Sequence, residues 1–209
     1  MNPHDISSLQ ERLDELRRRS AALLDSGKWA ACTAAHQRLE RSNQEILQLE
    51  RELAIAEGRQ YADPYQWDVP WTVSSDFESC YRGIHQSWIA YNCFRSESPE
   101  NTQIAIIRLI HAYSLRAGGS NDEVIEGHPL FGSGIHNCGA FIICNSNWID
   151  SERRIQSVHD QFSQSQWDVL RHFMWTFHDG IVEAIAEGVS VATQVGVLSQ
   201  RSAGSPGCL

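Results

Sequence analysis

The sequence predicts an α+β protein, with an N-terminal helical hairpin or coiled coil followed by an antiparallel β-rich domain with short helices. Up to Gly58, apolar residues recur at alternating spacings of three and four, which is typical of packed helices. Beyond Gly58, short runs rich in β-branched and aromatic residues alternate with turn residues. We therefore expect a helical segment over residues 1–58, a globular domain over 59–198 and a disordered tail over 199–209.

The helical segment carries one apolar stripe on each of two predicted helices, separated by the helix-breaking cluster Asp25-Ser26-Gly27. The first stripe comprises Ile6, Leu9, Leu13, Leu16 and Leu23, and the second comprises Cys32, Ala35, Leu39, Ser42, Ile46, Leu49, Leu53 and Ala56. Because such a narrow stripe cannot stabilise a lone helix in water, the helices must pack on each other, on the main domain or on another copy. Both an antiparallel hairpin and a dimerisation module fit this pattern.

Several runs after the helical segment have the composition of β-strands. They span residues 88–95, 138–146 and 171–178. The run 102–116 also fits a helix, but its alternating apolar residues from Ile107 to Leu115 favour a strand. Helices are expected to begin near Ser75 and Ser146, because each serine can cap a following stretch with early acidic residues.

The pair Asp179-Gly180 separates two alternating runs and predicts a β-hairpin with a two-residue type I′ turn. In that register Phe177 faces Val182 and Thr176 faces Glu183. One face of the hairpin would be a core face carrying Phe173, Trp175, Phe177, Val182, Ala184 and Ala186. The other face would carry His172, Met174, Thr176, His178, Ile181, Glu183, Ile185 and Glu187.

This second face is half apolar and half titratable, so it could line a pocket. Imidazoles within reach of carboxylates suit general acid/base catalysis, and the same set could bind a divalent metal. Alternatively, the histidine and glutamate residues of this face, His178 and Glu183 among them, form cross-strand pairs on a solvated surface. The sequence leaves these alternatives open.

A second cluster of titratable residues lies in the glycine-bounded loop 121–130, NDEVIEGHPL. Loops dense in glycine and acidic residues are either turns or functional sites. Here Asp122 could simply cap a turn and His128 could satisfy a backbone carbonyl. The candidate catalytic residues are His128, His178, Glu183, Asp122 and Glu123, and no metal-binding or cofactor-binding residue is assigned.

Short motifs in the β-rich region extend these two clusters. They are Asn121-Asp122-Glu123, Gly127-His128-Pro129-Leu130, Asn145-Ser146-Asn147-Trp148-Ile149, His159, and Phe177-His178-Asp179 with Glu183. Between residues 67 and about 190 the chain thereby resembles a group of bacterial proteins of unassigned activity. The chain departs from that group at Ser120, where the group has proline, and at Gly180-Ile181-Val182, where it has Ser-Thr-Phe. The resemblance supports the choice of residues and implies no substrate.

The composition limits which partners and which cellular compartment we expect for the protein. The formal net charge of −9 argues against nucleic acid or an anionic membrane as a partner. No apolar run suits a secretory signal or a membrane span, so we expect a cytoplasmic protein. The six cysteines are dispersed without a Cys-x-x-Cys pair, which favours buried thiols. A cysteine nucleophile, Cys80, Cys138 or Cys144, beside His128 or His178 is a further alternative.

Two classes of function remain. No Gly-x-Gly-x-x-Gly, phosphate-loop, Gly-x-Ser-x-Gly or His-Glu-x-x-His pattern occurs, so nucleotide binding, acyl transfer and zinc proteolysis have no sequence motif. The first class is an interaction or regulatory protein that assembles with itself or with a protein partner through the helical segment. The second is an enzyme that acts on a small molecule by His/Glu acid–base chemistry, with its cofactor, if any, unknown. The sequence slightly favours the first class.

Overall fold

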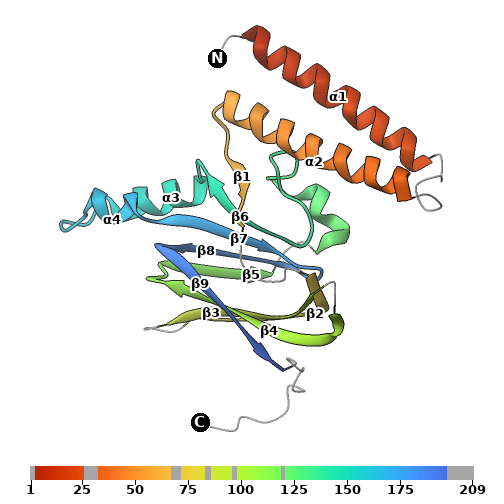
Figure 1. Ribbon diagram of the computed structural model, residues 1–209. Helices are drawn as coiled ribbons and strands as arrows, with labels where there is room; N and C mark the ends of the chain where they lie inside the picture. Colours follow the sequence, from red (N-terminus) through yellow and green to blue (C-terminus); the bar gives the residue numbers. More distant parts are fainter. Residues whose placement is uncertain are drawn as a thin grey trace.

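The computed structural model describes residues 3–25, 33–66, 72–82, 86–95, 98–118 and 121–196. Two helices precede two antiparallel sheets that carry short helices, which confirms the predicted α+β class (Figure 1). The predicted tail over 199–209 and the helix break at Ser26-Gly27 lie outside the described residues. In the described part of the chain, no helix is both long and apolar enough to cross a membrane.

Helices α1 (Pro3–Asp25) and α2 (Thr33–Ala56) lie side by side and antiparallel, as the predicted hairpin (Figure 1). Leu13, Leu49 and Leu53 form its buried apolar core. Ion pairs between Arg12 and Glu45 and between Arg17 and Glu50 cross the interface, as does a hydrogen bond between Ser20 and Asn43. The apolar stripes therefore close on each other within one chain.

The β-rich region consists of a five-stranded sheet and a four-stranded sheet, and every paired strand is antiparallel. In order across the five-stranded sheet, the strands are β1 (Tyr61–Pro64), β6 (Gly139–Cys144), β7 (Arg171–Thr176), β8 (Ile181–Ala186) and β5 (Ser114–Gly118). Across the four-stranded sheet they are β2 (Thr72–Arg82), β3 (Ser87–Arg95), β4 (Ser98–Ile110) and β9 (Gly188–Val195).

The predicted strands over 88–95, 138–146 and 171–178 are confirmed as β3, β6 and β7. The ambiguous run 102–116 is extended, as favoured, but it belongs to β4 and β5, which lie in different sheets. A turn at His111, whose φ is +48°, separates these two strands.

Three short helices complete the described part of the fold. They are the 3-10 helix η1 (Asp122–Gly127) and the α-helices α3 (Asn147–Gln156) and α4 (Gln164–Asp168). The predicted cap at Ser146 is confirmed, because its side chain accepts a hydrogen bond from the Ile149 amide. The helix expected near Ser75 is wrong: that residue lies in β2, where pairing with β3 outweighs the local capping pattern.

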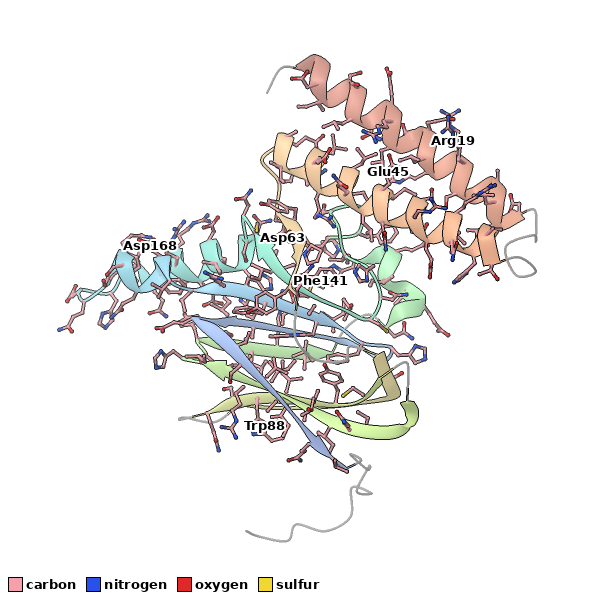
Figure 2. The ribbon with its side chains drawn as sticks, viewed as in Figure 1. Arg19, Glu45, Asp63, Trp88, Phe141 and Asp168 are labelled. Atoms are coloured by element: carbon pink, nitrogen blue, oxygen red, sulfur yellow. The ribbon has the colours of Figure 1, made fainter. Side chains whose placement is uncertain are left out.

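The two sheets pack face to face around the main apolar core. Ile89, Tyr91 and Ile107 of the four-stranded sheet meet Phe173 and Trp175 of the five-stranded sheet in one buried cluster. The opposite face of the five-stranded sheet is buried as well. Its apolar cluster comprises Ala62, Ile125, Leu130, Ile135, Phe141, Ile143, Met174 and Ile181, of which Phe141 is labelled in Figure 2.

The predicted register of the β7–β8 hairpin is wrong by two residues. Thr176 pairs with Ile181, and Phe177 closes the hairpin by donating its N–H to the Gly180 carbonyl oxygen at 2.8 Å. His178 and Asp179 therefore form the tip, and neither Asp179 nor Gly180 has the positive φ of a type I′ turn. Because side chains alternate with a period of two, a shift of two residues leaves each one on its predicted face. The predicted core face is confirmed, since all six of its residues lie in the main core.

We expect Phe177→Ala to destabilise the protein by about 3–5 kcal/mol, because the ring is 2% exposed and lies 5.3 Å from the Tyr91 ring. The adjacent substitution His178→Ala is the matched control, since this side chain is exposed at the hairpin tip. It should change stability by no more than about 0.5 kcal/mol. Urea denaturation of both variants measures the difference, and equal effects would contradict the assigned faces.

Candidate functional site

A histidine and a glutamate share the buried second face of the β7–β8 hairpin. His172 of β7 pairs with Ile185 of β8, which places Glu183 diagonally opposite on the same face. His172 Nε2 lies 3.0 Å from Glu183 Oε1, and the two residues are 3% and 8% exposed. Unlike a solvated cross-strand pair, this contact is shielded from water.

The second nitrogen of His172 contacts a serine at the start of α3. Ser146 Oγ lies 2.8 Å from His172 Nδ1. The serine is positioned by a tight strand–turn–helix connection, in which β6 ends at Cys144, Asn145 adopts a φ of +52° and α3 begins at Asn147. The same Oγ accepts the Ile149 amide at 3.2 Å as the helix cap. Local capping chemistry therefore holds the hydroxyl beside the imidazole.

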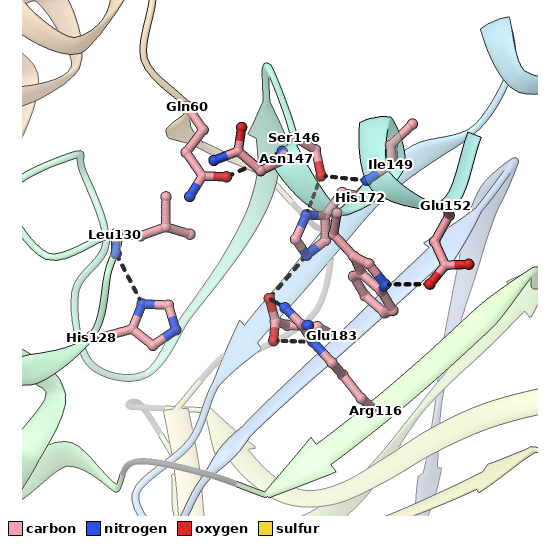
Figure 3. Close-up of polar contacts among 11 residues, drawn as sticks. Gln60, Arg116, His128, Leu130, Ser146, Asn147, Ile149, Glu152, His172 and Glu183 are labelled. Carbon is pink, nitrogen blue, oxygen red and sulfur yellow. Dashed lines mark hydrogen bonds and ion pairs between the residues drawn. The ribbon is translucent and has the colours of Figure 1, made fainter. Parts of the chain in front are cut away.

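Arg116 of β5 completes the network from the other side of Glu183. Its guanidinium donates two hydrogen bonds to the carboxylate, at 2.7 and 2.8 Å. The same group lies over the Trp148 ring, 4.0 Å from its centroid. Trp148 in turn donates to Glu152 (Figure 3). Figure 3 shows Ser146, His172, Glu183 and Arg116 in succession, each contacting the next.

The electrostatics of this network fix the state of the carboxyl group. Burial alone would raise the pKa of Glu183, but the hydrogen bonds from His172 and Arg116 outweigh it and lower the pKa to about 2. The ionised carboxylate can only accept, so when the His172 ring carries one proton we assign that proton to Nε2. Nδ1 then accepts the Ser146 hydroxyl proton, which gives a directed chain from serine through histidine to glutamate.

His128 lies near this network without being hydrogen-bonded into it. The Leu130 amide donates to His128 Nδ1 at 3.2 Å, and the ring lies across a gap from Glu183 (Figure 3). Burial lowers the pKa of His128, while the nearby Glu183 charge opposes this effect and the charge of Arg116 adds to it. The environment of His128 therefore favours its neutral form, and the ring lies outside the chain from Ser146 to Glu183.

The predicted site residues are only partly brought together. Glu183 is central and His128 is electrostatically coupled to it. His178 is exposed at the hairpin tip and Glu123 is exposed on η1, so neither belongs to the buried network. Asp122 is the first residue of η1, and its side chain is outside the described part of the structure.

Three members of the network were not among the predicted site residues. His172 was placed on the correct face but not selected. Ser146 was expected as a helix cap and lay within the Asn-Ser-Asn-Trp-Ile motif, but it was not assigned a catalytic role. Arg116 carried no sequence signal, because it reaches Glu183 through the β5–β8 pairing across 67 residues of chain. The sequence features that could have indicated them were the Asn-Ser-Asn-Trp-Ile motif for Ser146 and the second face of the hairpin for His172.

Ser146 and His172 line a cleft of about 510 Å³ between the start of α3 and the neighbouring strands. Its apolar side is formed by Ile142, Ile143, Ile149 and Leu170, and its polar side includes Asn145, Asn147 and Arg171. A cavity of this size can hold a small organic molecule. Ser146 and His172 therefore belong to the wall of a space that a small molecule could occupy.

Within the described residues, no three side chains of the types that bind metals converge on a common point. The comparisons with known proteins add no family: no protein-family model, no curated protein and no solved structure matches the chain. The chemistry of the site is therefore the basis for the functional proposal.

We expect the stability of the protein to fall as pH decreases from about 4.5, the ordinary pKa of a glutamate, toward about 2, the pKa of Glu183. Because folding lowers this pKa, the stabilisation is fully present above pH 4.5 and disappears as the folded carboxylate is protonated. The difference amounts to about 3 kcal/mol. Glu183→Gln should abolish this component, whereas Glu123→Gln, at an exposed position, should retain it. Urea denaturation between pH 7 and pH 2.5 tests this, and identical pH profiles for both variants would contradict it.

Proposed function

We propose that the protein is an enzyme of the hydrolase or acyl-transfer class that acts on a small molecule. Ser146 is the nucleophile, His172 is its general base and Glu183 orients the imidazole. The observation that supports this most strongly is the unbroken chain of hydrogen bonds from Ser146 Oγ through His172 to Glu183, at 2.8 and 3.0 Å. Serine, histidine and acid in this relation recur on unrelated folds, so roles and geometry matter more than sequence motif.

Three further features favour catalysis over a purely structural network. The serine follows a strand and precedes a helix, as nucleophiles do in many serine hydrolases. Glu183 is held ionised by Arg116, as the orienting acid must be. Ser146 and His172 also line the 510 Å³ cleft. The ring is reversed relative to the familiar triad, with Nδ1 toward serine, but either imidazole nitrogen can accept a proton.

The proposed reaction begins with attack of Ser146 Oγ on the carbonyl carbon of an ester or thioester. The hydroxyl proton passes to His172 Nδ1, and Glu183 stabilises the imidazolium through the Nε2 proton. Collapse of the tetrahedral intermediate expels the leaving group, which takes the proton from Nδ1 and leaves an acylated Ser146. Water, deprotonated by the same nitrogen, then releases the acid and restores the serine.

The start of α3 supplies positive potential where negative charge develops. The first-turn amides of a helix lack intrahelical acceptors and carry the positive end of its dipole. The Ile149 amide already contacts Ser146 Oγ and stabilises its alkoxide character. Among the described residues the Trp148 amide has no recorded acceptor, so it is available to an oxyanion.

Labelling with a fluorophosphonate probe tests the nucleophile without knowledge of the substrate. We expect one adduct per chain, located at Ser146 by peptide mass spectrometry and lost in Ser146→Ala. Glu183→Gln should slow the labelling at least tenfold, because the imidazole loses its orienting charge. Ser163→Ala is the matched control, since that serine is outside the network. Ser146→Ala also removes a helix cap worth about 1 kcal/mol, so its melting curve must show a folded protein. Labelling elsewhere, or labelling that is unchanged in Ser146→Ala, would contradict the proposal.

The helical hairpin supports a second candidate function, assembly with another copy or with a protein partner. Helix α1 lies on the side of α2 that faces away from the sheets (Figure 1), and Leu24 and Ile55 are 46% and 53% exposed. This candidate is compatible with an enzyme and would place it in an assembly. Either function would operate in the cytoplasm, in keeping with Cys93 and Cys144, which form no disulfide.

We expect the full chain to dimerise in the micromolar range if the hairpin is an assembly surface. The double substitution Leu24→Asp and Ile55→Asp should then weaken the dimer, because it places charge on the exposed apolar positions. Ile155→Asp, at an exposed position on α3, is the control. Sedimentation velocity over a hundredfold concentration range tests this, and a monomer at every concentration would remove the candidate.

A further inference from the structure

A second and larger cleft lies at the opposite end of α3 from Ser146. Its volume is about 700 Å³, and it is formed by the β4–β5 turn, the residue between β8 and β9, and the chain from the end of α3 to Leu170. It shares Leu170 with the Ser146 cleft but none of the hydrogen-bonded residues of that site. The cleft is therefore separate from the hydrogen-bonded network around Ser146.

Aromatic side chains form the apolar part of this cleft. The Tyr113 and Trp167 rings lie edge to face, with their centroids 4.9 Å apart. Trp167 is 7% exposed and packs against Tyr113. Tyr113 and Phe162 are half-buried and both line the cleft. The Tyr113 hydroxyl donates a hydrogen bond to Glu152 Oε2 at 3.1 Å, which fixes the orientation of the Tyr113 ring.

Planar amides form the polar rim. Gln156, Gln161 and Gln166 all line the cleft and are exposed. Within the described residues no hydrogen bond of their side-chain amides is recorded, so each amide can present a donor and an acceptor to a ligand. Ser163 and His159 add further hydrogen-bonding groups at the same edge.

The charged side chains that line the cleft do not favour an anionic ligand. No lysine or arginine is among the described residues that line it. Its one carboxylate, Glu187, is paired with His111 Nδ1 at 2.6 Å. Because this carboxylate already contacts an imidazole, the cleft presents no open carboxylate of the described residues to a cation, which favours a neutral ligand.

We propose that this cleft binds a neutral saccharide of one or two sugar rings. The partly positive C–H groups on one face of a pyranose match the negative faces of aromatic rings. Ring hydroxyls both donate and accept hydrogen bonds, as do the three glutamine amides at the rim. The volume fits within the range of roughly 300–1,000 Å³ for small-molecule sites. The proposal is independent of the nucleophilic role of Ser146.

Saturation-transfer NMR on the full chain tests this site with lactose, maltose, cellobiose and diacetylchitobiose at 5 mM. We expect transfer to at least one saccharide, strongest at the ring protons of one face, and quenching or shift of tryptophan fluorescence on titration. Phe162→Ala and Gln166→Ala should each weaken the measured Kd at least tenfold. Gln194→Ala, on β9 and outside this cleft, should leave the Kd unchanged.

The melting temperatures of Phe162→Ala and Gln166→Ala must stay within a few degrees of that of the parent protein. We expect this of Gln166→Ala, because the Gln166 side chain is exposed. Binding of a saccharide that depends on Phe162 or Gln166 supports the proposal. Absence of transfer for all four saccharides overturns it. Saccharide transfer that neither Phe162→Ala nor Gln166→Ala weakens also overturns it. The proposal is likewise overturned if adenosine or choline binds in this experiment and none of the saccharides does. Ser146→Ala should bind the saccharide as the parent does, so failure here and failure of the hydrolase proposal are separate results.

Discussion

The ion pair between Glu183 and Arg116 is the constraint on which this side of the protein depends. A buried carboxylate costs several kcal/mol unless it is paired and hydrogen-bonded, and Arg116 and His172 together occupy both of its oxygens. These contacts connect β5, β7 and β8, three neighbouring strands of one sheet. Removing one partner would leave an uncompensated charge next to the His172 imidazole. Each contact in the network consequently depends on the others. This mutual dependence holds Ser146 in a fixed position relative to His172.

The loop after η1 helps to cover the second face of the sheet, because Ile135 lies in its apolar cluster, and the helical hairpin packs on this loop. Arg51 of α2 packs on Gly134, in the loop that follows η1. A Cβ at Gly134, whose φ is +97°, would lie 2.5 Å from Arg51 Cγ and 2.8 Å from the Ala62 carbonyl oxygen, so only glycine fits there. Arg59, just beyond α2, donates to Ser133 in the same loop. The hairpin is therefore part of the packing of the β-rich domain, whatever its outer surface binds.

Signals that act over a few residues predicted the fold well, and signals that depend on tertiary contacts did not. Apolar spacing predicted both long helices, and alternation predicted the faces of the β7–β8 hairpin. The Asp179-Gly180 turn was wrong because turn preference gives way when packing of Phe177 and its neighbours decides the register. The helix expected near Ser75 was wrong for a similar reason, since pairing with β3 is a tertiary contact. Of the candidate site, the sequence indicated Glu183 and His128, whereas Arg116 reaches Glu183 only because β5 joins the edge of β8.

The position of α3 relates the two clefts physically. None of its residues is buried, so apolar packing alone cannot fix its place. Polar contacts hold it instead: Ser146 at its start contacts His172, Trp148 lies beneath Arg116, and Glu152 accepts hydrogen bonds from Trp148 and Tyr113. Tyr113 lines the aromatic cleft and Arg116 holds Glu183, so the same helix is anchored by residues of both regions. Because Ser146 is the cap of this helix, the position of its hydroxyl depends on all of these anchors, including those farthest from it in sequence. Because charge and hydrogen bonds hold this helix, the position of the Ser146 hydroxyl depends on the same network that holds Glu183.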